Sequence, residues 1–182
     1  MTVNTMQLIE FPYFKDTNGV LSVYESFDRV PFDIKRVFTV SAKAFDIRGE
    51  HAHKSCHQFL ICVSGQVTVM LDDGNKRAEI KLDSPALGLH IQPGVWGVQY
   101  KYSADAVLVV LASHIYDAED YIRDYSEFLA EEKEMIAKLK KSFLMVAGAA
   151  VQKFGAELEA HQQLLMAAAD MLIEIYMAES TV

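Results

Sequence analysis

The chain has 182 residues, 51% of them hydrophobic and 23% charged, and a net charge of −8 at pH 7. This length and composition predict a folded protein of one domain, or one domain with an appendage, and exclude a disordered chain. The acidic balance argues against a nucleic-acid-binding protein, because such proteins attract phosphates with a basic surface. The two cysteines, Cys56 and Cys62, are too few for a disulfide framework, so we expect a reducing compartment.

The first eleven residues do not combine a basic region with an apolar core, so we expect no signal peptide. No apolar run approaches the ~18 residues that a membrane-spanning helix needs. These features predict a cytoplasmic protein that binds neither membrane nor nucleic acid.

Short apolar or alternating runs separated by turns fill the chain up to about residue 125. Asn18-Gly19 and Asp73-Gly74 are typical of hairpin turns, and Pro85 interrupts the pattern at another turn. The runs that predict strands are residues 6–11, 20–24, 34–40, 59–63, 67–71, 78–82, 86–91, 98–102 and 106–112. Strands this short and this closely spaced indicate a mainly β protein, either a sandwich or a barrel. A jelly-roll barrel of this size encloses a ligand-sized interior.

The composition changes after Tyr125, where proline disappears and Ala, Glu, Lys, Leu and Met dominate. Ser126 is a suitable N-cap for a helix, and apolar residues recur from there at helical spacing. Gly155 interrupts the pattern, so we predict two helices, joined either as a hairpin or as a long kinked rod. We therefore divide the chain into a β domain, residues 1–130, and a helical appendage, residues 131–182. An amphipathic, Met-rich pair of this kind is expected to pack or to promote oligomerisation.

His51 and His53 stand two residues apart in the segment before the apolar run 59–63. If that segment is extended, its period of two places both imidazoles on one face, directed at one cavity. Two such rings can accept and return protons near neutral pH, or bind a metal ion. The alternative is a pair of partly exposed histidines on a strand, because a His-x-His pattern alone has little specificity.

The histidine segment resembles the first motif of metal-binding cupins, Gly-x5-His-x-His-x3-4-Glu-x6-Gly. Gln58 and Gly65 follow His53 at the expected spacing, but the residue at the carboxylate position is an amide. The second cupin motif supplies a third histidine after a proline, whereas Pro93 is followed by Gly-Val-Trp-Gly-Val. The loss of these ligands weakens a divalent metal site. We therefore expect that the site binds no metal ion. If it does bind one, His90 is the residue that could replace the missing third histidine.

Several successive motifs resemble one family. They are Arg-Gly-x-His-Ala-His-Lys from Arg48, Gln-Phe-Leu-Ile-Cys-Val-Ser-Gly from Gln58, Leu-Asp-Asp-Gly, Leu-Asp-Ser-Pro, Gly-Leu-x-Ile-x-Pro-x-Val-Trp, and Val-Leu-Ala-Ser-x-x-Tyr-Asp-x-x-Asp-Tyr-Ile-Arg-Asp-Tyr. Over about residues 6–130 the chain is similar to the dTDP-sugar 3,4-ketoisomerases, metal-independent cupins related to the WxcM-like proteins. The resemblance implies a cupin jelly-roll barrel.

The resemblance also implies a reaction and a site. Enzymes of this family convert dTDP-4-keto-6-deoxy-D-glucose to the 3-keto isomer, on the way to 3-amino-3,6-dideoxy sugars of surface glycans. The family pattern implies that His51 removes the C3 proton and that His53 shuttles protons between the oxygens of an enediol or enediolate, without a cofactor. The substrate-binding residues that it implies are Arg36 (for the pyrophosphate), Arg48, Lys54, Gln58 and Trp96.

The partners follow from the same resemblance. We expect a dTDP-linked 4-keto-6-deoxy sugar as the ligand. Family members act as dimers that exchange N-terminal strands, so we also expect a homodimer, to which the helical tail adds higher assembly. Two other interpretations stay open from the residues: a non-catalytic cupin that binds a sugar nucleotide, and a metal-dependent cupin enzyme.

Two positions depart from the family pattern. Asn18 stands where the family often has arginine, in Asp-x-Arg-Gly, and Gly97 stands where a basic residue often follows the tryptophan. If the basic side chains of the family face the sugar, their absence here affects the face on which C4 is protonated. The product could then have either configuration at C4.

The tail carries a second resemblance. Residues 146–155 and 169–176 are similar to C-terminal helices of acyl-CoA dehydrogenases, without a flavin site or a catalytic carboxylate loop. We therefore expect an appendage that is either a fused segment or an oligomerisation element.

Overall fold

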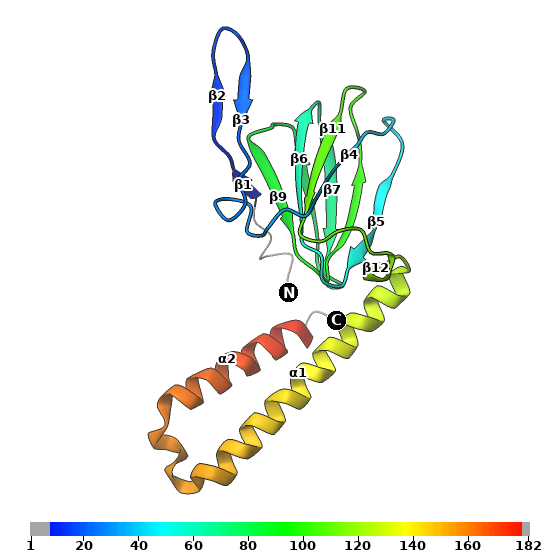
Figure 1. Ribbon diagram of the computed structural model, residues 1–182. Coiled ribbons are helices and arrows are strands. Elements are labelled where there is room, and N and C mark those ends of the chain that lie inside the picture. Colours follow the sequence, from blue (N-terminus) through cyan, green and yellow to red (C-terminus); the bar gives the residue numbers. More distant parts are fainter. Residues whose placement is uncertain (1–7, 180–182) are drawn as a thin grey trace. The chain divides into compact units, whose positions relative to one another are not determined.

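Two five-stranded antiparallel sheets form the β part of the structure, a computed structural model that describes residues 8–179 (Figure 1). The first sheet has the order β1-β9-β6-β11-β4 and the second the order β12-β5-β10-β7-β8. The strand bounds are β1 Leu8–Glu10, β4 Arg36–Val40, β5 Arg48–His53, β6 Gln58–Ser64, β7 Val67–Asp72, β8 Arg77–Leu82, β9 Leu87–Ile91, β10 Trp96–Tyr100, β11 Val107–Ala112 and β12 Tyr121–Ile122. Of these paired neighbours only β7 and β8 are consecutive in the chain, which is typical of a jelly roll and not of a meander.

The apolar core lies between the two sheets. Alternate residues of β7, namely Val67, Val69 and Leu71, are almost fully buried. They belong to one cluster with Leu60 of β6 and Leu108 of β11, which are strands of the opposite sheet. A period of two thus directs one face of each strand into the core, and the predicted mainly β, cupin-like fold is confirmed.

β6 is buried on both of its faces. Leu60 and Cys62 face the core, whereas Phe59 and Ile61 belong to a second apolar cluster that includes Phe32. This second cluster covers the other face of the first sheet with residues from the segment before β4. Burial on both sides explains why residues 59–62 are continuously apolar instead of alternating, whereas Val63 at the end of the run is exposed.

A two-stranded hairpin, β2 (Tyr13–Lys15) and β3 (Val20–Ser22), extends beyond the first sheet (Figure 1). Its turn forms where Asn-Gly predicts one. The carboxylate of Asp16 accepts hydrogen bonds from the backbone N–H groups of Asn18 at 2.7 Å and Gly19 at 2.9 Å. The sequence analysis did not predict β2, because this strand is short and follows a proline.

Two helices, α1 (Tyr125–Phe154) and α2 (Gln162–Glu179), follow the sheets and are joined by a 3-10 segment. The prediction that Ser126 caps the first helix is wrong. The carboxylate of Asp124 accepts hydrogen bonds from the backbone N–H groups of Ser126 at 2.8 Å and Glu127 at 3.0 Å. An anionic acceptor at this position also interacts favourably with the positive end of the helix dipole.

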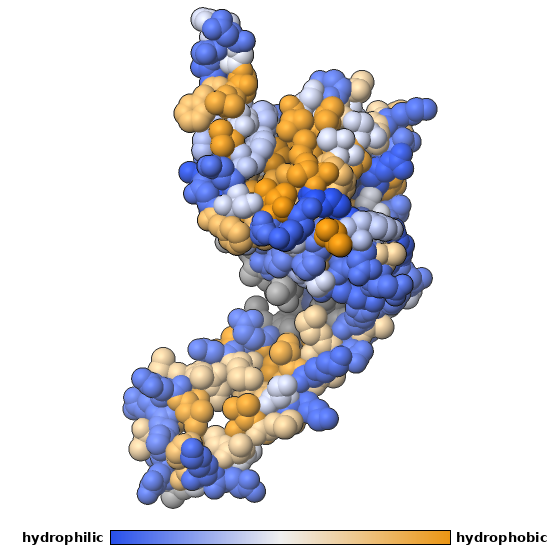
Figure 2. All heavy atoms as spheres, in the orientation of Figure 1, coloured by the Kyte–Doolittle hydropathy of each residue, from blue (hydrophilic) through white to orange (hydrophobic). Residues whose placement is uncertain are grey.

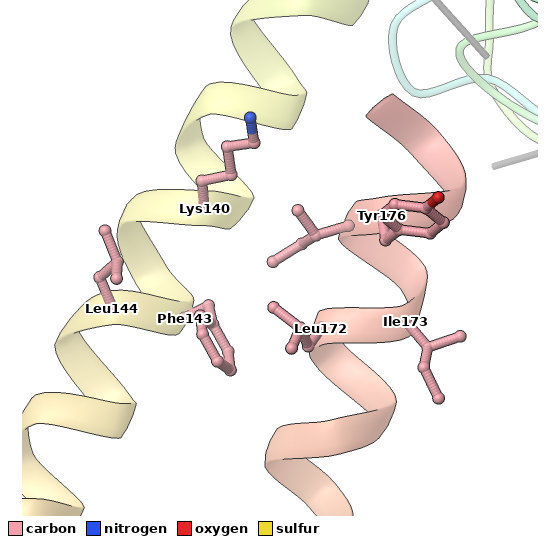
Figure 3. A pocket seen from close by; sticks show the side chains of 7 residues that line it. Lys140, Phe143, Leu144, Leu172, Ile173 and Tyr176 are labelled. Carbon is pink, nitrogen blue, oxygen red and sulfur yellow. The ribbon is translucent and has the colours of Figure 1, made fainter. Parts of the chain in front are cut away.

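The chain divides into two compact units, one up to Phe128 and one from Leu129. Within the second unit α1 and α2 form a hairpin, since side chains of both line one pocket (Figure 3). The connection bends at Gly155, whose left-handed φ of 49° suits a glycine. Across residues 8–179, no helix is both long enough and apolar enough to cross a bilayer.

Candidate active site

The two histidines lie on β5, whose backbone is distorted just before them. Gly49 and Glu50 have left-handed φ values of 82° and 54°, and the register between β5 and β10 shifts next to Gly97. A Cβ atom on Gly49 would lie 2.6 Å from the carbonyl oxygen of Gly97, so a larger residue would displace β10. The carbonyl oxygen of Gly49 lies 2.9 Å from Nδ1 of His51 and orients that ring.

The imidazoles of His51 and His53 lie on one face of β5 and line the same cavity, as the period of two predicts. Their Nε2 atoms are 3.2 Å apart, and the rings meet edge to face with centroids 4.9 Å apart. The side-chain nitrogen of Gln58, from the opposite sheet, lies 2.9 Å from Nε2 of His53. The ring of Tyr121 packs against both histidines, at centroid distances of 4.9 and 4.3 Å. The pair is therefore part of an organised interior site and not two independent surface residues.

Asp120 holds the far side of His53. Its Oδ2 atom is 2.7 Å from Nδ1 of His53. Its Oδ1 atom accepts hydrogen bonds from the backbone N–H of Ser55 at 2.8 Å and from the Ser55 hydroxyl at 2.6 Å. The short strand β12 brings this carboxylate into place, because Tyr121 pairs directly with His53.

The hydrogen bonds determine where the protons lie on each ring. The carboxylate of Asp120 and the carbonyl of Gly49 accept only, so Nδ1 of His53 and Nδ1 of His51 each carry a hydrogen. In the neutral rings both Nε2 atoms then carry lone pairs that face each other. A single proton placed between these atoms can bind to either ring, so the pair can hold one mobile proton.

Burial keeps the two rings neutral near neutral pH. It lowers the pKa of His53 to about 4, although the hydrogen bond with Asp120 opposes this shift. It also lowers the pKa of His51, where a backbone hydrogen bond opposes the shift and the positive charge of Arg123 adds to it. Burial alone would raise the pKa of Asp120, but hydrogen bonds from Ser55 and His53 outweigh it and lower that pKa. The site thus combines an ionised carboxylate with two neutral bases.

A cavity beside the histidines is lined by side chains of both sheets. Its lining residues are His51, His53, Cys56, Gln58, Ile91, Gln92, Val95, Gly97 and Gln99. Apart from the histidines, the polar side chains of this lining are mostly amides, which both donate and accept hydrogen bonds. The cavity has a volume of only about 10 Å³, room for about one water-sized group, and such a lining can bind a hydroxyl or carbonyl group that enters it.

Two guanidinium groups lie against Tyr121. The Arg36 side chain is 3.5 Å from the Tyr121 hydroxyl, and that of Arg123 lies 4.4 Å from the centre of the Tyr121 ring. Arg36 also stacks on Phe38 and Tyr116, while its Nε atom is buried without a hydrogen-bond partner among the described residues. Paired guanidinium groups beside an aromatic ring are suited to bind phosphate oxygens.

Besides Arg36, three more of the predicted substrate-binding residues lie outside the cavity lining. Arg48 and Lys54 are exposed, at the start of β5 and just after its end. Trp96 is only 6% exposed and packs against Tyr125 and Phe128 at centroid distances of 5.2 and 5.6 Å. The indole therefore anchors the first turn of α1 to β10. A role for these three residues in substrate binding stays a prediction.

His90, which offered a substitute metal ligand, does not line the cavity. Its Nε2 atom lies 3.0 Å from Nδ1 of His57, so these two histidines form a separate pair. A different group, made of His53, Cys56 and Asp120, places one ligand-type atom of each residue within 4.8 Å of the others. A metal ion there would compete with the hydrogen bond between Asp120 and His53.

The sequence analysis assigned no role to Asp120, Tyr121 or Arg123. All three stand in the motif from Tyr116 to Tyr125, which contributes to the family resemblance, and that motif is the one signal for them in the sequence. The contact of Asp120 and Tyr121 with the histidines depends on the pairing of β12 with β5, which sets Tyr121 opposite His53 and brings Asp120 to His53, 67 positions away in the chain.

Two family models match the chain. One described as WxcM-like, C-terminal, matches residues 4–133, which is more than half of the sequence. One described as acyl-CoA dehydrogenase, C-terminal domain, matches residues 138–182. The predicted resemblance of the tail to the C-terminal helices of acyl-CoA dehydrogenases is therefore confirmed over residues 138–182.

Curated and solved relatives agree with the first model. The TDP-4-oxo-6-deoxy-alpha-D-glucose-3,4-oxoisomerase of Aneurinibacillus thermoaerophilus is 45% identical over 134 residues, which cover 73% of this chain and 94% of that protein. The sugar 3,4-ketoisomerase QdtA from Thermoanaerobacterium thermosaccharolyticum, solved with TDP, aligns with a TM-score of 0.71 and 38% identity, over 74% of this chain and 98% of its own. A mutant of QdtA, solved with TDP-4-keto-6-deoxyglucose, aligns with a TM-score of 0.70 and 38% identity, over 74% of this chain and 97% of its own. These matches confirm the predicted resemblance, and the chain belongs to the WxcM-like family.

Proposed function

We propose that the protein is a nucleotide-sugar 3,4-ketoisomerase that converts TDP-4-keto-6-deoxy-D-glucose to its 3-keto isomer. The choice of substrate is supported by the curated relative, which is named for this reaction, and by the solved relative that holds this sugar nucleotide. The observation that carries the proposal is the 3.2 Å contact between Nε2 of His51 and Nε2 of His53, with Asp120 behind His53 at 2.7 Å.

The reaction needs proton transfer and no net oxidation. Removal of the C3 proton, which is acidified by the C4 carbonyl, leaves an enediolate with its charge on the C4 oxygen. The C3 hydroxyl then gives its proton to the C4 oxygen, and the negative charge moves to the C3 oxygen. Protonation at C4 completes the 3-keto sugar, so substrate and product have the same atomic composition, although the C3 proton can exchange with solvent.

The histidine pair supplies the two groups that this sequence of transfers requires. We assign His51 as the base at carbon and His53 as the shuttle between the two oxygens. Both rings are neutral before the reaction and can take a proton, because burial lowers both pKa values. Asp120 acts as a positioning residue that keeps Nδ1 of His53 protonated and stabilises the imidazolium when it forms.

We place the nucleotide end of the substrate near the two guanidinium groups. Arg36 and Arg123 both contact Tyr121, which itself packs on the histidines. A pyrophosphate bound there would leave the sugar directed towards the cavity. Gln58, at 2.9 Å from His53, is then available to donate a hydrogen bond to a sugar oxygen or to the enediolate.

The configuration of the product at C4 depends on which face receives the proton. Gly97 lines the cavity and pairs with His51 across the strands, so it offers no side chain to that face. Asn18 lies in the turn of the β2–β3 hairpin. We propose that a protein without basic residues at these two positions takes its C4 proton from the histidine pair itself.

We further propose a metal-independent homodimer that exchanges the β2–β3 hairpin between copies. Phe14 and Leu21 of this hairpin are each 59% exposed, and an isolated two-stranded hairpin is marginally stable in water. Pairing with a second copy would cover both side chains. We propose that the 3-keto sugar made by this enzyme is a precursor of 3-amino-3,6-dideoxy sugars for O-antigen or S-layer glycans. We place the reaction in the cytoplasm, where nucleotide sugars are made.

The proposal is tested by NMR of TDP-4-keto-6-deoxyglucose incubated with the protein in D2O, with and without EDTA. We expect the 3-keto sugar to appear with solvent deuterium at C4, at the same rate in both samples. Loss of turnover in EDTA would favour a metal-dependent cupin enzyme at the group formed by His53, Cys56 and Asp120. Binding of the nucleotide without exchange or product would favour a non-catalytic sugar-nucleotide-binding protein.

A further inference from the structure

A groove of about 520 Å³ runs between the two helices of the second unit (Figure 3). Its lining is apolar except for Lys140. Phe143 of α1 and Leu172 of α2 point towards each other across it, whereas Leu144 and Ile173 lie on the outer flanks of the two helices. The flanks stay uncovered: Leu144 is 68% exposed and Ile173 is 58% exposed.

The apolar surface of each helix is wider than one neighbouring helix can cover. On α1 it extends beyond Phe143 to Leu144 and Val151, which are exposed. On α2 it extends beyond Leu172 to Ile173 and Tyr176, which are also exposed. The space-filling view shows apolar side chains spread over both helices (Figure 2). A stripe of this width is typical of a helix that contacts two neighbours, as in a four-helix bundle.

Charge differs between α2 and the part of α1 that follows Glu134. From Met135 to Phe154, α1 contains four lysines and no acidic residue, whereas α2 contains three acidic residues and no lysine or arginine. Lys141 lies one helical turn before Leu144, and Asp170 lies one turn before Ile173. The groove is thus bordered by a basic edge on α1 and an acidic edge on α2, and both border residues are exposed.

We propose that the helix pair of a second copy of this chain occupies the groove and completes an antiparallel four-helix bundle. A two-fold axis parallel to the helices would place α1 of each copy over α2 of the other. The basic edge of one copy would then meet the acidic edge of the other, and the same contact would form twice. This surface belongs to the second unit, so the association does not depend on the hairpin exchange or on the isomerase reaction.

The arrangement predicts which residues meet. Leu144 and Leu172 both line the groove and lie at the same level along the two helices in Figure 3, so the axis brings Leu144 of one copy level with Leu172 and Ile173 of the other. The native cysteines, Cys56 and Cys62, are buried and free, and they are not expected to interfere with a surface cross-link.

The test mixes a full-length Leu144→Cys protein with a full-length Ile173→Cys protein that carries a distinguishable tag. Mild oxidation should give a covalent heterodimer from the mixture, while neither variant alone should cross-link efficiently. A mixture of Val146→Cys with Ile173→Cys is the matched control, because Val146 is also exposed on α1 but does not line the groove. This control should give no heterodimer.

A second measurement uses mass in solution. Leu144→Glu should cause loss of the association that the helix pair mediates, whereas Val146→Glu should leave it intact. Isomerase turnover of both variants reports that the first unit is folded, and circular dichroism reports that the helices are formed. Absence of a heterodimer, together with an unchanged mass for Leu144→Glu, would overturn the proposal. Efficient cross-linking of Leu144→Cys to itself would overturn this arrangement of the helices in favour of a contact between two α1 helices.

Discussion

The Oδ2 atom of Asp120 lies 2.7 Å from Nδ1 of His53, although 67 positions separate the two residues in the chain. The contact leaves Nε2 of His53 as the reactive atom, facing Nε2 of His51 at 3.2 Å. The second oxygen of Asp120 is held by Ser55, so the carboxylate cannot easily turn away. The geometry of the histidine pair therefore depends on a residue that does not line the cavity.

Asp120→Asn should lower kcat by about 100-fold or more, because the imidazolium of His53 loses its counter-charge and its fixed tautomer. KM should change little if Asp120 acts only through His53. The measurement is steady-state kinetics across pH, in which the profile of the variant should change shape. Glu119→Gln is the matched control, since Glu119 is an exposed neighbour, and its turnover should stay at the wild-type level. Equal effects of both changes on kcat would argue against a positioning role.

His51→Asn should abolish turnover and retain TDP binding, because the change removes the base at carbon and keeps a polar side chain of similar size. Calorimetry with TDP and NMR with the keto sugar measure the two properties separately. His161→Asn, at an exposed position between the two helices, is the control. If isomerisation persists in His51→Asn, the assignment of this residue as the base is wrong.

Acid should destabilise the fold between about pH 6.5 and pH 4. Burial lowers the pKa values of His53 and His90 to about 4, whereas an unfolded histidine titrates near 6.5. In that window the unfolded chain binds more protons, so the free energy of unfolding rises with pH, is fully present above about 6.5 and falls towards pH 4. Each residue should contribute about one proton to the slope near pH 5. Urea unfolding of His90→Gln should show a slope smaller by about one proton, and an unchanged slope would contradict the prediction.

Gly49→Ala should destabilise the protein by about 1–3 kcal/mol and reduce turnover, because the residue has a left-handed φ and its new methyl group meets a backbone oxygen of β10. The same strain displaces the carbonyl that orients His51. Gly148→Ala in α1 is the matched control, since nothing lies within 4 Å of a Cβ added there. This second change should stabilise the helix by up to about 1 kcal/mol. Thermal unfolding and kinetics of both variants test the contrast.

Removal of metal ions should leave turnover unchanged. His90 is paired with His57 outside the cavity, and Gln58 occupies the position where metal-binding cupins have a carboxylate. The measurement is turnover after dialysis against a chelator, with the metal content determined in the same samples. A loss that zinc or iron restores would instead identify the group of His53, Cys56 and Asp120 as a metal centre.

Period-two alternation and turn residues predicted most strands of the two sheets, because these signals are local. The same reasoning correctly placed His51 and His53 on one face, directed at one cavity. It missed β2 and β12, each too short to show a period, and with β12 it missed Asp120 and its contact with His53. It did not predict that Trp96 packs on Tyr125 and Phe128, since a local pattern does not show that the first turn of α1 lies against the indole. A local sequence pattern could not predict contacts between residues that are distant in the chain and are brought together by strand pairing.

The order of the strands has a consequence for synthesis of the protein. The histidines leave the ribosome early, within β5, whereas Asp120 and β12 follow every other strand of both sheets. A nascent chain that ends after β11 already contains four of the five strands of the second sheet and both bases, but not the carboxylate that fixes one of them. We therefore expect the β core to be largely folded during translation before the catalytic site is complete. The site would become active only in the last step, when β12 pairs with β5.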